Sequence, residues 1–243
     1  MARINKFVIG IRPASRMFRI PSVIGLIIDS ILSERGGKTL ADDYFLEVAS
    51  NHEKMNYRLR NDDLGNTLII NMDNIVFTKD YYGNEKQFNF KKVHSEFLHI
   101  WQIVNENLKI KDIRRIGIVA EHQFEEEETK SNKILVETLT PFENIKHPAK
   151  FRLKFENRHP TAEGLAPDLE KSDFINVIYD IYDSEEDADH PAKGSINANI
   201  DVQRYFSPLL KSNIPEQILK LHNMFQNERT KFETFLKNRG LLK

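Results

Sequence analysis

Three carboxylates on predicted strands are the residues of this chain whose spacing would suit metal-assisted chemistry. Glu121 lies near the end of one predicted strand, and Asp180 and Asp201 lie on two later strands that we expect to be neighbours. Several converging carboxylates hold the divalent cations of phosphoryl-transfer enzymes. A metal-dependent nuclease or phosphoesterase would therefore use Glu121, Asp180 and Asp201 as its catalytic residues.

An alternative interpretation gives the same carboxylates a structural role. The segment Lys154-Phe155-Glu156 reverses the Glu-x-Lys order that is familiar from nucleases. Its basic strand face would neutralise Asp180 and Asp201 through cross-strand charge pairs. His122 follows Glu121 directly, so the two side chains point to opposite faces of a strand and do not bind one ion together. We therefore predict no metal site and no cofactor.

The chain lacks the short motifs that identify common enzyme classes. It contains no G-x-G-x-x-G, G-x-x-x-x-G-K-[ST], H-E-x-x-H or G-x-S-x-G sequence. It also has no cysteine, which excludes disulfides, thiolate nucleophiles and iron–sulfur clusters. These exclusions favour a non-catalytic protein-binding or regulatory module with an unidentified protein partner. A chain without cysteine also fits the reducing cytoplasm, which we predict as its location.

Basic side chains make nucleic-acid binding a second alternative. The residues assigned to such a site are Arg114, Arg115, Lys150 and Arg152. A wider patch would add four arginines, Arg12, Arg16, Arg19 and Arg158. Tyr57 and Phe151 are candidates to stack on bases. A formal net charge of −1 weighs against this alternative, because nucleic-acid-binding domains usually have a basic balance.

Charge is unevenly distributed along the chain. The N-terminal arm and the end beyond Lys211 are basic, whereas the stretch between about 112 and 210 is acidic. Two runs, Glu125–Glu128 and Asp183–Asp189, contain no internal base. We predict a homodimer, the commonest soluble assembly, in which basic ends of one copy meet the acidic runs of the other.

The last predicted helix supplies both kinds of contact for this dimer. Its basic residues are Lys231, Lys237 and Arg239, and its aromatic residues are Phe225, Phe232 and Phe235. We expect more aromatic surface here than one sheet face covers. The alternative is that these rings belong to the core and that the acidic runs are solvated.

Hydrophobic periodicity predicts the elements that position these residues. Alternation or short apolar runs indicate strands over 7–12, 54–60, 67–72, 75–78, 113–124, 151–156, 174–182 and 196–206. Helical spacing predicts helices over 23–32 and 90–108 and from 213 onward, with Asn89 as an N-cap. Short turns outnumber the gaps that parallel crossovers need. We therefore predict an α+β fold with mainly antiparallel sheets.

Each half of the chain runs from strands into a long amphipathic helix. We predict two related halves, 1–125 and 126–243, each with its helix packed on a sheet and both within one compact unit. The longest apolar run, Val23 to Leu32, contains Asp29 and has about half of the ~20 residues that a membrane helix needs. We expect no membrane span.

Three segments together resemble a known family. They are Arg115-Ile116-Gly117-Ile118 at the start of a strand, Ile200-Asp201-Val202 in a late strand, and Leu221-His222 before Phe225 in the last helix. In these segments the chain is similar to a sporadically distributed prokaryotic family of uncharacterised proteins of about this length. Asn199 stands where that family has the first acid of its late strand. The resemblance implies no catalytic residues, and the patchy distribution implies an accessory protein of a mobile-element or defence locus.

Overall fold

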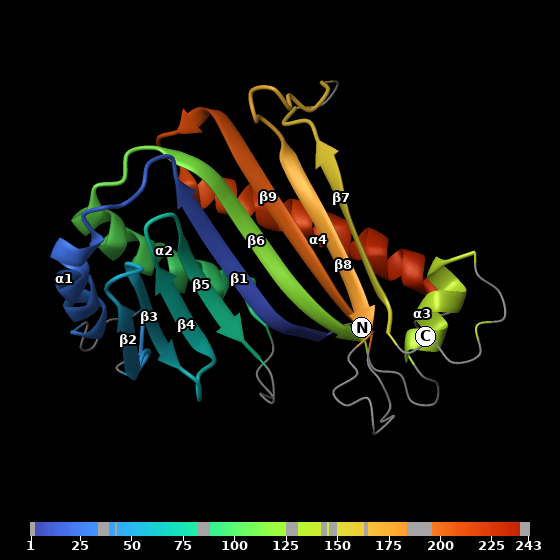
Figure 1. Ribbon diagram of the computed structural model, residues 1–243, viewed down its shortest axis with the longest axis horizontal. Helices are drawn as coiled ribbons and strands as arrows, with labels where there is room; N and C mark the ends of the chain where they lie inside the picture. The colour runs from blue at the N-terminus through green and yellow to red at the C-terminus, as the bar shows by residue number, and fades with distance from the viewer. Residues whose placement is uncertain are drawn as a thin grey trace.

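The computed structural model in Figure 1 contains one large antiparallel sheet with helices packed against it. The structure describes residues 3–33, 39–41, 43–81, 88–124, 131–141, 145, 150–162, 165–183 and 196–238. Nine strands of this part pair in the order β2-β3-β4-β5-β1-β6-β9-β8-β7, and every pair is antiparallel. The predicted α+β class with an antiparallel sheet is confirmed.

The elements follow one another with both halves contributing strands to the same sheet. The strands are β1 (Arg3–Pro13), β2 (Glu47–Asn51), β3 (Asn56–Asn61), β4 (Asn66–Ile70), β5 (Ile75–Asp80), β6 (Ile113–Phe124), β7 (Arg152–His159), β8 (Ile175–Asp183) and β9 (Ile196–Leu210). The helices are α1 (Ile20–Leu32), α2 (Phe90–Leu108), α3 (Ser131–Leu139) and α4 (Ile214–Asn238).

The two central strands, β1 and β6, alternate buried and half-exposed side chains, as the sequence pattern predicts. Phe7 and Ile9 of β1 are fully buried, and so are Ile116 and Ile118 of β6. The residues between them point to the opposite face of the sheet and stay half-exposed. One face of the sheet is therefore the core face, and the other carries the half-exposed members of these two strands.

Helices α2 and α4 cover the core face. Figure 1 shows both behind the sheet, with α1 beside the β2 end. Phe7 meets Phe225 of α4 at a centroid distance of 6.1 Å, and Phe77 of β5 stacks on Phe97 of α2 at 6.3 Å. In the part of the chain that the structure describes, no helix or strand covers the other face. We call this the open face.

The long helices form where the sequence predicts them. The Asn89 side chain accepts a hydrogen bond from the backbone N–H of Lys92 at 3.2 Å, so it caps α2 as expected. The prediction that Phe225 and Phe232 contribute to a dimer surface is wrong. Phe225 is fully buried and Phe232 is 7% exposed, because the apolar stripe of α4 packs on β6 and β9. Phe235 is 37% exposed.

Several expectations lie beyond this description. Most of both acidic runs, Arg239 and the boundary at 125/126 fall outside the described residues, so the charge-paired dimer and the division into halves stay predictions. Among the described residues, no helix is long and apolar enough to cross a bilayer. Two elements were not predicted, the edge strand β2 and the helix α3.

Candidate functional site

The three candidate catalytic carboxylates lie on neighbouring strands of the open face. Asn199 of β9 stands opposite Glu121 of β6 on one side and opposite Asp180 of β8 on the other. Asp201 follows two residues along β9 and points to the same face. The expectation that the strands of Asp180 and Asp201 are neighbours is confirmed. Because β9 separates Glu121 from Asp180, about 10 Å lies between the backbones of those two residues.

Asp180 is already bound by an arginine. Arg152 of β7 donates from Nε to Asp180 Oδ1 at 2.7 Å and from Nη2 to Oδ2 at 2.5 Å. The Asp180 side chain is 10% exposed and that of Arg152 is 65% exposed, so the bidentate pair occupies both carboxylate oxygens at the surface of the sheet. The predicted charge pairing of Asp180 across strands is confirmed. Within the described ranges, no group of three His, Cys, Asp or Glu side chains is placed to hold a metal ion.

Asp201 is the most perturbed acid of the open face. Burial raises the pKa of Asp201 to about 6, against an opposing effect of the Gln203 hydrogen bond, Arg115 and Lys154. Gln203 Nε2 donates to Asp201 Oδ2 at 2.5 Å. Burial also raises the pKa of Glu121, although Lys6 acts in the opposite direction. These acids are held apart and partly desolvated, which is unlike a site that concentrates negative charge on a cation.

His122 occupies the core face, as its neighbour relation to Glu121 predicts. Its ring lies 5.7 Å from the Phe225 ring, and Nδ1 is 3.2 Å from the Ala198 carbonyl oxygen. Burial lowers the pKa of His122 to about 4. The imidazole is therefore a neutral core group near pH 7, and it does not share an ion with Glu121.

The four basic residues assigned to nucleic acid fall into two groups at opposite ends of the sheet. Arg114 and Arg115 begin β6, whereas Lys150 and Arg152 lie at the start of β7, in line with the far end of β6. Arg152 is level with Gln123 of β6, and the eight residue steps from Arg115 to Gln123 span about 26 Å. Tyr57 is 1% exposed on the core face, so it is wrong as a stacking residue.

A larger group of basic side chains lies at the end of the sheet where β1 ends and β6 begins. Strand pairing sets Arg12 of β1 opposite Arg115 of β6 on the open face. The segment after β1 and the segment before β6 then run beside each other and add further cations. We call the set the basic cluster, and its members are Arg12, Arg16, Arg19, Lys109, Lys111, Arg114 and Arg115.

Two backbone segments hold the basic cluster in place. The N–H of Ala14 donates to the Asp112 carbonyl at 2.9 Å, and the N–H of Met17 donates to the Met72 carbonyl at 2.8 Å. Lys109 ends α2 in the left-handed conformation (φ 55°), and the next N–H, that of Ile110, donates to Asn105 Oδ1 at 3.0 Å. These bonds turn the chain sharply after α2 and direct 109–112 alongside 14–19.

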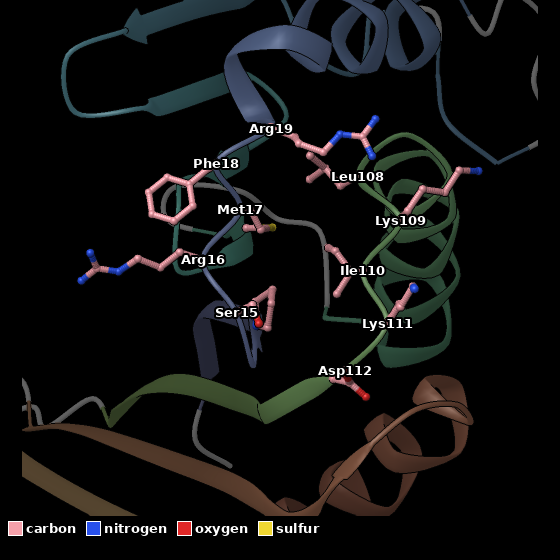
Figure 2. Close-up of a pocket in the computed structure, with 11 residues that line it drawn as sticks. Ser15, Arg16, Met17, Phe18, Arg19, Leu108, Lys109, Ile110, Lys111 and Asp112 are labelled. Carbon is pink, nitrogen blue, oxygen red and sulfur yellow. The ribbon is translucent and has the colours of Figure 1, made fainter.

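A cavity of about 330 Å³ lies between the two segments. Figure 2 shows Met17, Leu108 and Ile110 facing one another across it. In the same view Arg19, Lys109 and Lys111 extend to one side, and Arg16 and Phe18 extend to the other. The cavity therefore has an apolar floor with cations on both sides.

Most of the basic cluster has no neutralising partner among the described residues. Arg16 pairs with Asp73 at 3.4 Å, and Asp112 lines the cavity. Arg115 donates to Gln203 Oε1 at 3.1 Å and to the Tyr205 hydroxyl at 3.3 Å, and its charge also favours the ionised form of Asp201. The described carboxylates form no ion pair within 4.0 Å of Arg12, Arg19, Lys109, Lys111 or Arg114.

Sequence reasoning identified five members of the basic cluster and missed two. Lys109 and Lys111 flank Ile110 after a long helix and carry no recognisable motif. The signal that would have identified them is their position in the connection between α2 and β6. This connection lies beside the end of β1, where the arginines of the basic cluster stand. A scan against protein-family models matches none, and a search of curated proteins finds no match to the sequence.

Proposed function

We propose that this protein is a non-catalytic binding module and that its ligand is single-stranded nucleic acid, held at the basic cluster. The observation that carries the proposal is the Arg12–Arg115 pair on the open face. Like charges directly opposite each other on adjacent strands destabilise a sheet. A local cost of this kind is typical of functional sites, and a phosphate bound beside Arg12 would reduce it.

The surroundings of this pair support an anionic ligand. Arg19, Lys109 and Lys111 extend to one side of the adjoining cavity and have no carboxylate partner among the described residues. The whole chain has a formal net charge of −1, so the remaining surface has an acidic balance. Such an asymmetric field orients a polyanion toward the basic cluster and away from the rest of the molecule.

An exposed aromatic ring favours a single strand over a duplex. Phe18 lies between Arg16 and Arg19 and is 64% exposed, the largest exposed fraction among the large apolar side chains of the described chain. A base of a single strand stacks on such a ring, whereas the bases of a duplex are already stacked. Phe18 thus takes the role that the sequence analysis gave to Tyr57.

A salt titration of binding tests this proposal. The ligand is a fluorescent single-stranded oligonucleotide of about 20 nucleotides, and anisotropy is measured between about 50 and 200 mM salt. The variant combines Arg19→Gln, Lys109→Gln and Lys111→Gln. Losing three phosphate contacts makes the slope of log K against log salt shallower by about 2. A single change, Phe18→Ala, weakens binding by about 1–3 kcal/mol without changing the slope.

The matched control removes the same charge elsewhere. Lys91→Gln, Lys171→Gln and Lys237→Gln change three exposed lysines outside the basic cluster. This control retains the wild-type slope if the basic cluster is the site. Equal losses in the two triple variants would reject the site, and the absence of any salt-dependent binding by the wild type would reject the function.

Protein binding is the second candidate, and the bare open face favours it. Its middle carries small side chains on adjacent strands, the apolar Val8 of β1 and Val119 of β6 and the hydroxyl-bearing Thr78 of β5. A regulatory partner would be encoded beside this chain if it belongs to a mobile-element or defence locus. Co-purification with the products of neighbouring genes tests this candidate, and loss of the complex on Val119→Lys locates it on the open face.

The nuclease or phosphoesterase alternative keeps a direct test. Calorimetric titration with Mn²⁺ or Mg²⁺ measures whether the acids of the open face bind a divalent cation. Tight binding that Asp201→Ala abolishes would restore the enzyme hypothesis. We expect no such binding, because Arg152 neutralises Asp180 and the strand β9 keeps Glu121 away from it.

A further inference from the structure

The two edges of the sheet differ in how they are protected. β7 forms one edge and carries four charged side chains, Arg152, Lys154, Glu156 and Arg158, in eight residues. β2 forms the other edge, and its sequence Glu-Val-Ala-Ser-Asn has one charged residue and no proline. Charge and proline are the usual devices that keep a sheet edge from pairing with another chain.

Strand β2 is also exposed along its whole length. All five residues are exposed, and no described strand pairs with its outer edge. Apolar side chains stand on and beside it, since Val48 is 47% exposed and Leu46 is 63% exposed. Leu26 of α1, the helix at this end of the sheet, is 60% exposed. The backbone and the side chains here are both available to a partner.

The sequence of β2 is complementary to itself in the antiparallel direction. When Ala49 lies opposite Ala49 of a second copy, Val48 lies opposite Ser50 and Glu47 opposite Asn51. No like charges then face each other, because about 13 Å of strand separates the two glutamates. Each Glu47 keeps its own partner, Arg60, at 2.5 Å. A second copy of this chain therefore fits the edge without an uncompensated charge.

We infer that the protein forms a two-fold dimer in which β2 pairs with β2 of a second copy and joins the two sheets into one. A two-fold contact of this kind uses the same patch on both copies, so the assembly stops at two copies and does not extend into a fibre. The backbone hydrogen bonds and the apolar side chains make it insensitive to salt. In this respect it differs from the charge-paired dimer predicted from the sequence, which salt would dissociate.

Cross-linking tests the register directly, because the chain contains no cysteine. In antiparallel strands facing Cα atoms lie about 4.5–5.5 Å apart, within the range of about 4.4–6.8 Å that a disulfide needs. Ala49→Cys is therefore expected to give a covalent dimer when diamide oxidises the two thiols. Leu219→Cys on α4, 47% exposed, is the control and remains monomeric on a non-reducing gel.

Light scattering on the full chain tests the association itself. The wild type is expected to be a dimer at low and high salt, and Val48→Lys a monomer. Leu219→Lys changes a side chain of the same exposed fraction, 47%, and is expected to remain a dimer. Circular dichroism checks that each variant is folded, and Leu46→Lys replaces Val48→Lys if that variant is not.

Three results would overturn the inference. They are a wild type that is monomeric at every concentration, a Val48→Lys protein that stays dimeric, and Ala49→Cys chains that cross-link no faster than the control. Oligomers that grow with concentration would also contradict it, because they would mean head-to-tail pairing of β2 with β7. Failure of nucleic-acid binding leaves this inference intact, since the two tests use different residues.

Discussion

Replacing Asp201 by asparagine is expected to stabilise the protein at neutral pH. The carboxyl is a largely buried group of the open face, and burial raises its pKa from 3.8 to about 6. In the unfolded chain the same group ionises near its ordinary pKa. The folded state therefore binds a proton between pH 4 and 6 that the unfolded state has released.

The sign and the size follow from this difference. Asp201 favours the folded state below pH 4, and this contribution is lost as pH rises through about 6. A shift of about two pKa units corresponds to about 3 kcal/mol at 1.36 kcal/mol per unit. Asparagine carries no charge at any of these pH values and still offers an oxygen to Gln203. The stability gained by Asp201→Asn is thus near zero at pH 4 and about 3 kcal/mol at pH 7.5.

Urea denaturation of both proteins at pH 4, 5, 6 and 7.5 measures the effect. The quantity of interest is the change of their stability difference with pH, because a constant offset from altered hydrogen bonding cancels. Asp63→Asn in the exposed turn between β3 and β4 is the control and should give a flat difference. A flat difference for Asp201→Asn as well would show that the carboxyl is solvated in solution, against this reasoning.

Three further predictions concern a core histidine, a turn and the helix α1. His122→Gln removes a group whose pKa burial lowers to about 4, so the wild type loses about 3 kcal/mol more stability than the variant as pH falls from 6.5 to 4. Acid titration followed by circular dichroism compares the two. Gly65→Ala costs more than about 2 kcal/mol in calorimetry, because φ is 67° and a Cβ would lie 2.0 Å from the Asp80 carbonyl oxygen. In Gly25→Ala the new Cβ meets no atom within 4 Å, so the protein gains about 0.5–1 kcal/mol of stability. Equal effects of the two glycine substitutions would contradict the reasoning for both positions.

Local pattern determined the elements that have a strong period. The strand at Ile113–Phe124 and the helix at Phe90–Leu108 have the predicted bounds, since each buries one regular stripe of its own residues. Periodicity failed for Glu47–Asn51, whose residues are all exposed and show no alternation. That strand forms because its backbone pairs with β3, and among its side chains only Glu47 supports the pairing, through Arg60.

Register, which only the tertiary structure decided, determined the sites. The sequence gives Asp180 and Arg152 as charges on separate strands, and the pairing of β7 with β8 brings them into one bidentate contact. The pairing of β1 with β6 likewise sets Arg12 opposite Arg115. A shift of one residue in either pairing would send these side chains to opposite faces. Register depends on the packing of the whole sheet against α2 and α4, so no local stretch of sequence specifies which charges meet.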